Sequence, residues 1–200
     1  MSQQAFWNEK FSREGYLYGK EPNAFLSNCY NNFIKSERIL CLGEGEGRNA
    51  IFLAKKGYEV AAIDASDIGL KKLESFAQQE HVSVTTRCQD LNEWVPNKKY
   101  GAIVFSYLHL LDNEKQSLFT KIETSLIHQG FFIAEVFSKN QLNYSSGGPK
   151  DAELLYSIED FKKAFKHCII HKLEEVEVEL DEGKGHKGLA SVIRIIAQRN

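Results

Sequence analysis

The sequence has few features that would place the protein in a membrane or in an oxidising compartment. No apolar run approaches the roughly 20 residues that span a bilayer, and the opening residues MSQQAFWNEKF lack the regions of a signal peptide. The four cysteines are far apart and form no CxxC pair (Cys29, Cys41, Cys88 and Cys168). Buried, reduced thiols are the favoured interpretation. We therefore expect a soluble protein in the cytoplasm.

The sequence also lacks the charge pattern of a nucleic-acid-binding protein. Its formal net charge is -2, and its lysines occur as scattered pairs among acidic residues, with no basic stripe. Neutralisation of phosphates supplies most of the affinity for a duplex, so nucleic acid is not expected as the main partner. Internal repeats, low-complexity tracts and linkers are absent too. These features predict one domain over residues 1–200.

Apolar strands and amphipathic helices alternate along most of the chain. After helices at 3–14 and 22–34, strands are predicted at 39–42, 59–63, 82–87, 101–105 and 131–137. The intervening helices are expected at 48–56 (ended by Gly57), from Ser66 or Asp67 to about 79, at 114–128 (ended by Gly130), and at 158–165. Two last strands, 169–180 and 188–197, form a hairpin around DEGKGHKG. This order predicts a parallel sheet covered on both faces, with an antiparallel edge.

A glycine-rich turn, GEGEG, follows the first predicted strand at residues 43–47. Gly43 and Gly45 permit positive φ and close backbone approach to a ligand beyond the strand end. The dinucleotide fingerprint GxGxxG would need its third glycine at Arg48. Glu44 and Glu46 would repel a pyrophosphate. The same carboxylates favour S-adenosylmethionine, whose sulfonium and ammonium outnumber its single carboxylate.

Two further acids follow the next strands. Asp64 ends the second strand, where it can accept both ribose hydroxyls of a nucleoside. Asp90, in RCQDL, can accept an adenine amino group while Leu91 packs on the ring. Each acid alone is more often a helix cap or turn former, and the glycine turn alone could be plain packing. Three such features at successive strand ends favour a cofactor site.

Four segments resemble a known enzyme family: FWNEKFSREGYLYGKEPNAFL, LCLGEGEGRNAIFLAKKGYEVAAIDAS, GGPKDAELLYS and EGKGHKGLASVIRIIA. Through these four segments the sequence resembles a class I S-adenosylmethionine-dependent methyltransferase of the subgroup that includes the tellurite-resistance and thiopurine methyltransferases. The resemblance covers nearly the whole chain. It implies an α/β, Rossmann-like doubly wound fold with seven mostly parallel strands and an antiparallel last strand. It also implies an N-terminal helical lid, 1–36, over the core at 37–200.

The resemblance places a set of residues around S-adenosylmethionine, with no metal. Most of the superfamily has an acid two residues before the first glycine, where this chain has Cys41. Glu44 would then pair with the ammonium or with nearby backbone amides. Tyr18 is expected at the methionine end, whereas Trp7 and Phe11 are most simply an apolar helix face. The expected cofactor residues are Tyr18, Gly43, Glu44, Gly45, Asp64, Ala65, Asp90, Leu91, Phe105 and Ser106.

The candidate catalytic residues are Tyr107, His109 and His186. The segment VFSYLHLLD puts Tyr107 and His109 at the end of the fourth strand, where His109 would orient an acceptor, take its proton, or only cap the next turn. His186, in GKGHKG, is either a solvated turn residue or part of a cationic flap that draws in an anionic or polarisable acceptor. The loop SSGGPKD is expected to form the opposite wall of the site.

The expected reaction is in-line displacement at the methyl group of the sulfonium, which needs positioning and no covalent intermediate. No recognition domain is apparent, so we expect a small-molecule acceptor, and the resemblance favours sulfur, selenium or tellurium. The segment [DN]PP[YFW], expected for methylation of DNA amino groups, is absent. The alternatives are a non-catalytic S-adenosylmethionine-binding regulator or partner subunit, and an NAD(P)-dependent oxidoreductase. The sequence does not predict the oligomeric state.

Overall fold

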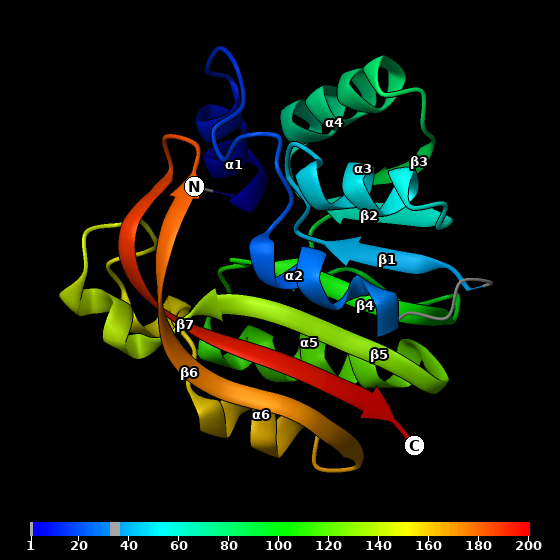
Figure 1. The fold of residues 1–200 in the computed structure, drawn as a ribbon, viewed down its shortest axis with the longest axis vertical. Coiled ribbons are helices and arrows are strands. Elements are labelled where there is room, and N and C mark those ends of the chain that lie inside the picture. The colour runs from blue at the N-terminus through cyan, green and yellow to red at the C-terminus, as the bar shows by residue number, and fades with distance from the viewer. Residues whose placement is uncertain (1, 33–36) are drawn as a thin grey trace.

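A seven-stranded sheet forms the centre of the computed structural model, which describes residues 2–32 and 37–200 (Figure 1). The strand order is β3-β2-β1-β4-β5-β7-β6. Strands β1 to β5 run parallel, and β7 lies antiparallel between β5 and β6. The strands are β1 (Ile39–Leu42), β2 (Val60–Asp64), β3 (Val84–Cys88), β4 (Tyr100–Ser106), β5 (Leu126–Phe137), β6 (Cys168–Glu182) and β7 (His186–Arg199). The predicted antiparallel last strand is confirmed, although the strand at the edge is β6.

Helices cover both faces of the sheet because alternate strand residues point to opposite sides. In β1, Ile39 and Cys41 belong to one buried cluster, and Leu40 and Leu42 to the other. The first cluster includes α2 (Ala24–Cys29), α3 (Arg48–Lys55) and α4 (Asp67–Gln79). The second includes α5 (Asp112–Ser125) and α6 (Ile158–Ala164). This is the doubly wound arrangement that the alternating pattern predicted.

The end of α5 differs from the prediction. The helix stops at Ser125 and β5 begins at once, so the expected helix to 128, ended by Gly130, is wrong. Leu126 pairs with Tyr100 of β4, and this pairing in the sheet overrides the local helical pattern. Gln129 takes a positive φ of 61° where the chain turns into the main run of the strand.

The N-terminal segment divides into two parts with different roles. Helix α1 (Gln3–Phe11) is shorter than the predicted 3–14 and contacts α4. Helix α2 continues as η1 (Tyr30–Asn32), and the rest of the predicted helix to 34 lies outside the described residues. Since Phe25 and Leu26 of α2 pack in the core, α2 covers the sheet and is no part of a lid. None of the helices in the described part of the chain is long and apolar enough to cross a membrane.

The closing hairpin is longer and tighter than predicted. Strands β6 and β7 continue toward the tip until only three residues, 183–185, join them. Figure 1 shows the tip reaching the blue segment around α1, and the Gly185 N–H donates to the Leu17 carbonyl at 3.1 Å. The segment between β5 and α6 contains η2 (Lys139–Asn143) and η3 (Ala152–Leu154). The hairpin therefore meets the N-terminal segment across the sheet's carboxyl edge.

Candidate active site

A cavity opens at the carboxyl ends of β1, β2 and β4 and extends to α1 and the tip of the hairpin. Its empty volume is about 890 Å³ with its open mouth included. Twelve of the thirteen predicted site residues line it. They are Tyr18, Gly43, Glu44, Gly45, Asp64, Ala65, Asp90, Leu91, Ser106, Tyr107, His109 and His186.

Phe105 is the predicted site residue that the structure places elsewhere. Its ring is 3% exposed and meets Phe132 at 5.2 Å between centroids, within the core below the cavity. The cavity lies beyond the carboxyl end of β4. Phe105 comes one residue before the last residue of the strand, Ser106, and its side chain points to the opposite face, into the core. The prediction that it contacts the cofactor is therefore wrong.

The glycine turn has the backbone that the sequence predicted. Gly43 and Gly45 both adopt φ of 58°, and a Cβ on Gly45 would lie 2.9 Å from the Phe11 ring. Residue 47 is the N-cap of α3, with φ of 98° and no side-chain cap. The turn thus leaves backbone exposed to the cavity and leaves the first amides of α3 in need of acceptors.

Glu44 supplies the acceptor for those amides. Its Oε1 accepts from the backbone N–H of Asn49 at 2.9 Å and of Ala50 at 2.7 Å. Burial raises the pKa of Glu44 to about 7, although these bonds act in the opposite direction. Of the two roles predicted for Glu44, the structure contains the pairing with backbone amides.

Asp64 braces the same turn from the end of β2. Its Oδ2 accepts from the Gly45 N–H at 2.8 Å and its Oδ1 from the Ser66 N–H at 2.7 Å. Burial raises the pKa of Asp64 to about 6. A carboxylate oxygen has more than one lone-pair site, so both oxygens retain capacity for a ribose hydroxyl.

Asp90 and Leu91 lie beyond the end of β3, on the side of the cavity away from α3. Asp90 Oδ1 accepts from the Asn92 N–H at 2.9 Å, which is the local turn that a lone Asp often makes. Leu91 is 7% exposed and lines the cavity. Asp90 thus forms a turn and faces the cavity as well.

Glu46, the second acid of the turn, fastens the N-terminal segment. Its Oε2 accepts from the Leu17 N–H at 2.7 Å, and its Oε1 pairs with Lys72 at 2.7 Å. Lys72 in turn donates to the carbonyls of Arg13 and Gly15. Glu46 therefore holds the backbone next to Tyr18, which lines the cavity, and the sequence did not indicate this role.

The other end of the cavity is built from rings. Trp7 stacks on His109 at 6.0 Å between centroids, and His109 stacks on Phe137 at 6.2 Å. His186 lies 4.4 Å from Tyr18 and 4.4 Å from Tyr107. Trp7, which the sequence placed on a packing face, lines the cavity. The negative faces of such rings attract cations such as a sulfonium.

Tyr107 is held in a strained backbone conformation by buried partners. It has a positive φ of 53°, and its hydroxyl donates to Glu135 Oε1 at 2.7 Å. Glu135 also pairs with Arg194 at 2.6 Å. Burial, followed by the nearby Glu135, raises the pKa of Tyr107 well above its usual value, so the phenol stays protonated.

His186 is not the solvated turn residue that its sequence context suggested. It is 2% exposed, so it is no solvated turn residue, while Lys184 and Lys187 beside it point to solvent. Burial lowers the pKa of His186, so the ring is neutral at pH 7 and the flap carries no imidazolium into the cavity. The physical reason is the short turn, which folds the hairpin onto Leu17 and buries the ring.

The SSGGPKD loop supports the hairpin from behind. Lys187 N–H donates to the Ser146 carbonyl at 2.9 Å, and a Cβ on Gly147 would lie 2.6 Å from the Gly185 carbonyl oxygen. These residues are not in the lining of the cavity. The prediction that this loop forms a wall of the site is therefore wrong.

Sequence reasoning missed two charged residues, Arg48 and Glu182. Arg48 is 8% exposed, lines the cavity, and pairs through Nη2 with Glu182 at 3.0 Å. Arg48 had been considered only as the missing glycine of a fingerprint, and Glu182 is one acid among many in β6. A signal existed for the first residue, because an arginine in the first turn of a helix opposes the helix dipole.

Comparison with known proteins agrees with the fold. The family model described as "Tellurite resistance protein TehB" matches residues 24–132. A protein of Geobacillus sp. (strain WCH70), named as a methyltransferase, is 23% identical over 188 residues, covering 84% of this chain and 75% of its own.

TehB of Haemophilus influenzae is similar in both sequence and structure. The protein of strain 10810, named as an S-adenosyl-L-methionine-dependent methyltransferase, is 27% identical over 79 residues, 40% of this chain, and the match spans 28% of its own length. The crystal structure of TehB from this organism superposes with a TM-score of 0.74 at 17% identity, covering 100% of this chain and 68% of that one. Structural likeness at this identity establishes the fold.

A third relative was solved with the cofactor bound. The magnesium protoporphyrin IX methyltransferase of Synechocystis PCC 6803 with bound S-adenosylmethionine superposes with a TM-score of 0.69 at 16% identity. The superposition covers 100% of this chain and 98% of that chain. At 16% identity this likeness, too, establishes the fold alone.

Proposed function

This chain belongs to the family of the tellurite resistance protein TehB, and we propose from that premise that it transfers a methyl group from S-adenosylmethionine to a small, soft nucleophile. The proposed acceptor atom is sulfur, selenium or tellurium. When bound, S-adenosylmethionine supplies an electrophilic methyl group on a sulfonium. The protein's contribution is to bind both molecules and align them for in-line attack.

The observation that carries the proposal is the joining of two unlike ends in one cavity. Near β1, β2 and β3 lie glycine backbone and the carboxylates of Asp64 and Asp90. Near α1 and the hairpin lie Trp7, Tyr18 and the two histidines. The first end suits a nucleoside, and the second suits a sulfonium and a polarisable acceptor next to it.

The residues present fit S-adenosylmethionine on structural grounds. A Cβ at Gly43 would meet Leu108 Cδ1 at 2.6 Å, so glycine lets the turn pack closely against Leu108, which lines the cavity. We expect Asp64 to hold the ribose, Asp90 and Leu91 the adenine, and Tyr18 the methionine end. Glu44 stabilises α3 beneath them.

The acceptor end supports a soft and compact nucleophile. Aromatic and histidine rings dominate it, and such surfaces favour polarisable groups over strongly hydrated ones. Tyr107 stays protonated and serves as a wall that Glu135 holds in place. His186 is the proposed catalytic residue, and His109 is proposed to line the acceptor pocket.

Calorimetric titration with S-adenosylmethionine, S-adenosylhomocysteine and NADH tests the cofactor assignment. We expect the first two to bind and NADH not to bind, since Glu44 already occupies the first amides of α3, which a pyrophosphate would need. Binding of NADH alone would overturn the proposal.

A screen of thiols, selenols, selenite and tellurite with radiolabelled methyl donor then tests the acceptor class. Tight cofactor binding with no turnover of any acceptor would instead indicate a regulator or partner subunit.

A further inference from the structure

One carboxylate, Glu182, joins the glycine turn to the acceptor end. Its Oε2 lies 3.0 Å from Arg48 Nη2 and 3.1 Å from His186 Nδ1. Its Oε1 accepts from Asn23 Nδ2 at 3.3 Å. Only 12% of the Glu182 side chain is exposed. The arrangement is a buried carboxylate that holds an imidazole ring by one nitrogen.

This contact determines which nitrogen of His186 carries the proton. A carboxylate accepts hydrogen bonds, so the neutral ring places its hydrogen on Nδ1 and a lone pair on Nε2. Nε2 has no hydrogen-bond partner within the described part of the chain. In that same part only Arg48 Nη1 and Gln89 Oε1 are fully buried polar side-chain atoms without a partner. Nε2 is therefore not fully buried, and His186 lines the cavity.

We propose that Glu182 is a positioning residue that directs Nε2 of His186 at the acceptor, and that the acceptor is a thiol whose proton Nε2 removes. The inference rests on the proposed function and narrows its acceptor class. The S–H bond breaks, and its proton goes to Nε2. The remaining electron pair bonds to the methyl carbon as the bond from that carbon to the sulfonium sulfur breaks. Tellurite and selenite attack through a lone pair already free, so they have no need of this base.

The charges around His186 are compatible with a neutral base. Burial lowers its pKa, the Glu182 carboxylate raises it, Arg48 lowers it and Glu135 raises it weakly. The pKa of Tyr18 is raised to about 12 by burial, so its hydroxyl stays protonated beside the ring. The titratable or charged groups facing His186 are Glu182 from β6, Arg48 from α3, Glu135 from β5, Tyr18 from the N-terminal segment, and Tyr107 and His109 from the segment after β4.

His109 lacks the feature that orients His186. It lies between the rings of Trp7 and Phe137 and has no hydrogen-bond partner among residues 2–32 and 37–200. Burial, with His186 as the second cause, lowers its pKa to about 3. Nothing fixes its tautomer, so we assign proton removal to His186.

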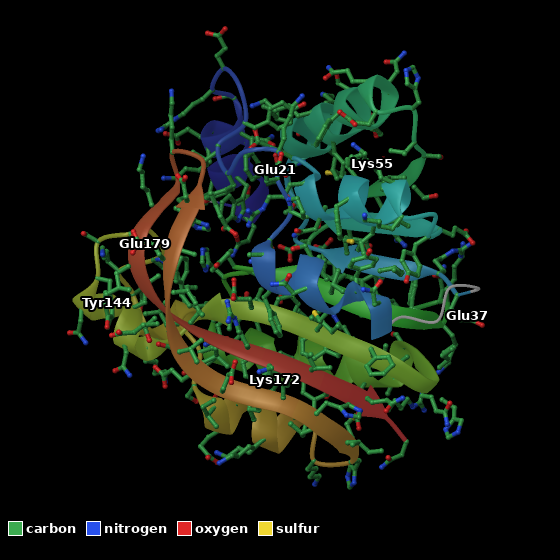
Figure 2. The ribbon with its side chains drawn as sticks, in the orientation of Figure 1. Glu21, Glu37, Lys55, Tyr144, Lys172 and Glu179 are labelled. Carbon is green, nitrogen blue, oxygen red and sulfur yellow. The ribbon has the colours of Figure 1, made fainter. Side chains whose placement is uncertain are left out.

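Nitrogen-detected NMR of the cofactor-free protein tests the positioning role without any turnover. We expect the wild-type His186 ring to be protonated on Nδ1. In Glu182→Gln the midpoint of its titration should move toward acid by about one pH unit or more, because an opposite charge is lost. The matched control is Glu179→Gln on the same strand, where Glu179 is exposed (Figure 2), and it should change nothing. An unchanged titration in Glu182→Gln, or a proton on Nε2, would overturn the proposal.

A pair of thiol probes tests the proton removal. An alkyl thiol is largely protonated at pH 7, whereas a nitro-substituted aryl thiol is already ionised. His186→Ala should slow methylation of the alkyl thiol by about 10²-fold, the lower end of what a positioned base contributes. It should leave the aryl thiolate nearly unchanged, and Glu182→Gln should show a smaller loss with the same preference. Equal losses for both thiols would overturn the proposal.

The two failures can be told apart. If the wild-type protein binds S-adenosylmethionine but methylates selenite or tellurite and neither thiol, the inferred acceptor is wrong and the proposed methyltransferase stands. If it binds no S-adenosylmethionine, the proposed function fails, and the acceptor inference fails with it.

Discussion

The two ends of the cavity are held together by different kinds of contact. At the glycine turn, Glu44 and Asp64 each accept two backbone N–H groups from residues no more than 19 positions away in the chain. At the acceptor end, Trp7, Tyr18 and the histidines meet as rings supplied by α1, the N-terminal loop, the segment after β4 and the hairpin. One end is built locally, and the other is assembled from segments far apart.

The two ends also respond to pH in opposite directions, and for the same reason. Burial raises the pKa of the Glu44 and Asp64 carboxyls and lowers the pKa of His109 and His186, because burial penalises the charged form of any group. Acid therefore favours the folded glycine turn and disfavours the folded acceptor end.

The largest effect is expected where the turn meets its neighbour helix. A Cβ on Gly47 would lie 2.4 Å from Leu73 Cγ and 3.1 Å from its Cα, at a φ of 98°. Gly47→Ala should lower the free energy of unfolding by about 2–5 kcal/mol through strain and overpacking. Gly57→Ala is the control, since Gly57 has φ of 89° and open space around it. Urea titration of both variants separates packing from backbone strain, and equal losses would show that Leu73 adapts freely.

A smaller effect is expected from the Glu44 carboxyl. Its folded pKa of about 7 exceeds its ordinary value of 4.5. The protonated Glu44 carboxyl therefore stabilises the fold fully below pH 4.5, and this contribution is lost as the pH rises to 7. The free energy of unfolding should fall by about 3 kcal/mol at most. Glu44→Gln keeps an accepting oxygen and should flatten this fall in urea unfolding from pH 5 to 7.

His109→Gln provides the opposite test. Its folded pKa lies below the unfolded value of 6.5, so its contribution is present above pH 6.5 and is lost as pH falls. The variant should lose less stability than wild type between pH 6.5 and 4.5. If the free energy of unfolding changes with pH in the same way in wild type and in either variant, the opposite pH responses proposed for the two ends are wrong.

Cofactor affinity should depend more on the glycine-turn end than on the rings. Asp64→Ala is expected to weaken S-adenosylmethionine binding by roughly 1.5–3 kcal/mol, about tenfold to a hundredfold in Kd, because a charged acceptor is lost. Calorimetry measures it, with circular dichroism as the check on folding. Asp181→Ala on the exposed side of β6 is the control. Unchanged affinity in a folded Asp64→Ala protein would remove Asp64 from the site.

The smallest expected effect is a difference between two ligands. Trp7→Leu removes a ring face from the acceptor end and should weaken S-adenosylmethionine by about 0.5–1 kcal/mol, with little change for the neutral product S-adenosylhomocysteine. Phe6→Leu on the same helix is the control, since Phe6 is 43% exposed. Equal weakening of both ligands would show that Trp7 contributes packing and no cation–π attraction.

The glycine-turn end was largely predictable because its determinants are local. Ser66 caps α4 through the Gly69 N–H at 2.9 Å, and Gly57 ends α3 with a positive φ, both as the pattern indicated. The strands of the parallel sheet also follow from short apolar runs. The end of α5 was missed because Leu126 pairs with Tyr100, a contact that no local pattern contains.

The acceptor end was less predictable because its contacts connect residues far apart in the chain. Arg48 and Glu182 are 134 positions apart. His186 looked solvent-exposed among its glycines and lysines, and only the fold of the hairpin onto Leu17 buries it. Phe105 was misplaced by one residue, which in a strand is enough to turn a side chain from the site into the core.

The backbone of Leu17 holds both ends at once. Its N–H donates to Glu46 of the glycine turn, and its carbonyl accepts from Gly185 of the hairpin. Lifting this one residue breaks both hydrogen bonds together. A proteolytic cut beside Leu17 would therefore release two walls of the cavity at once.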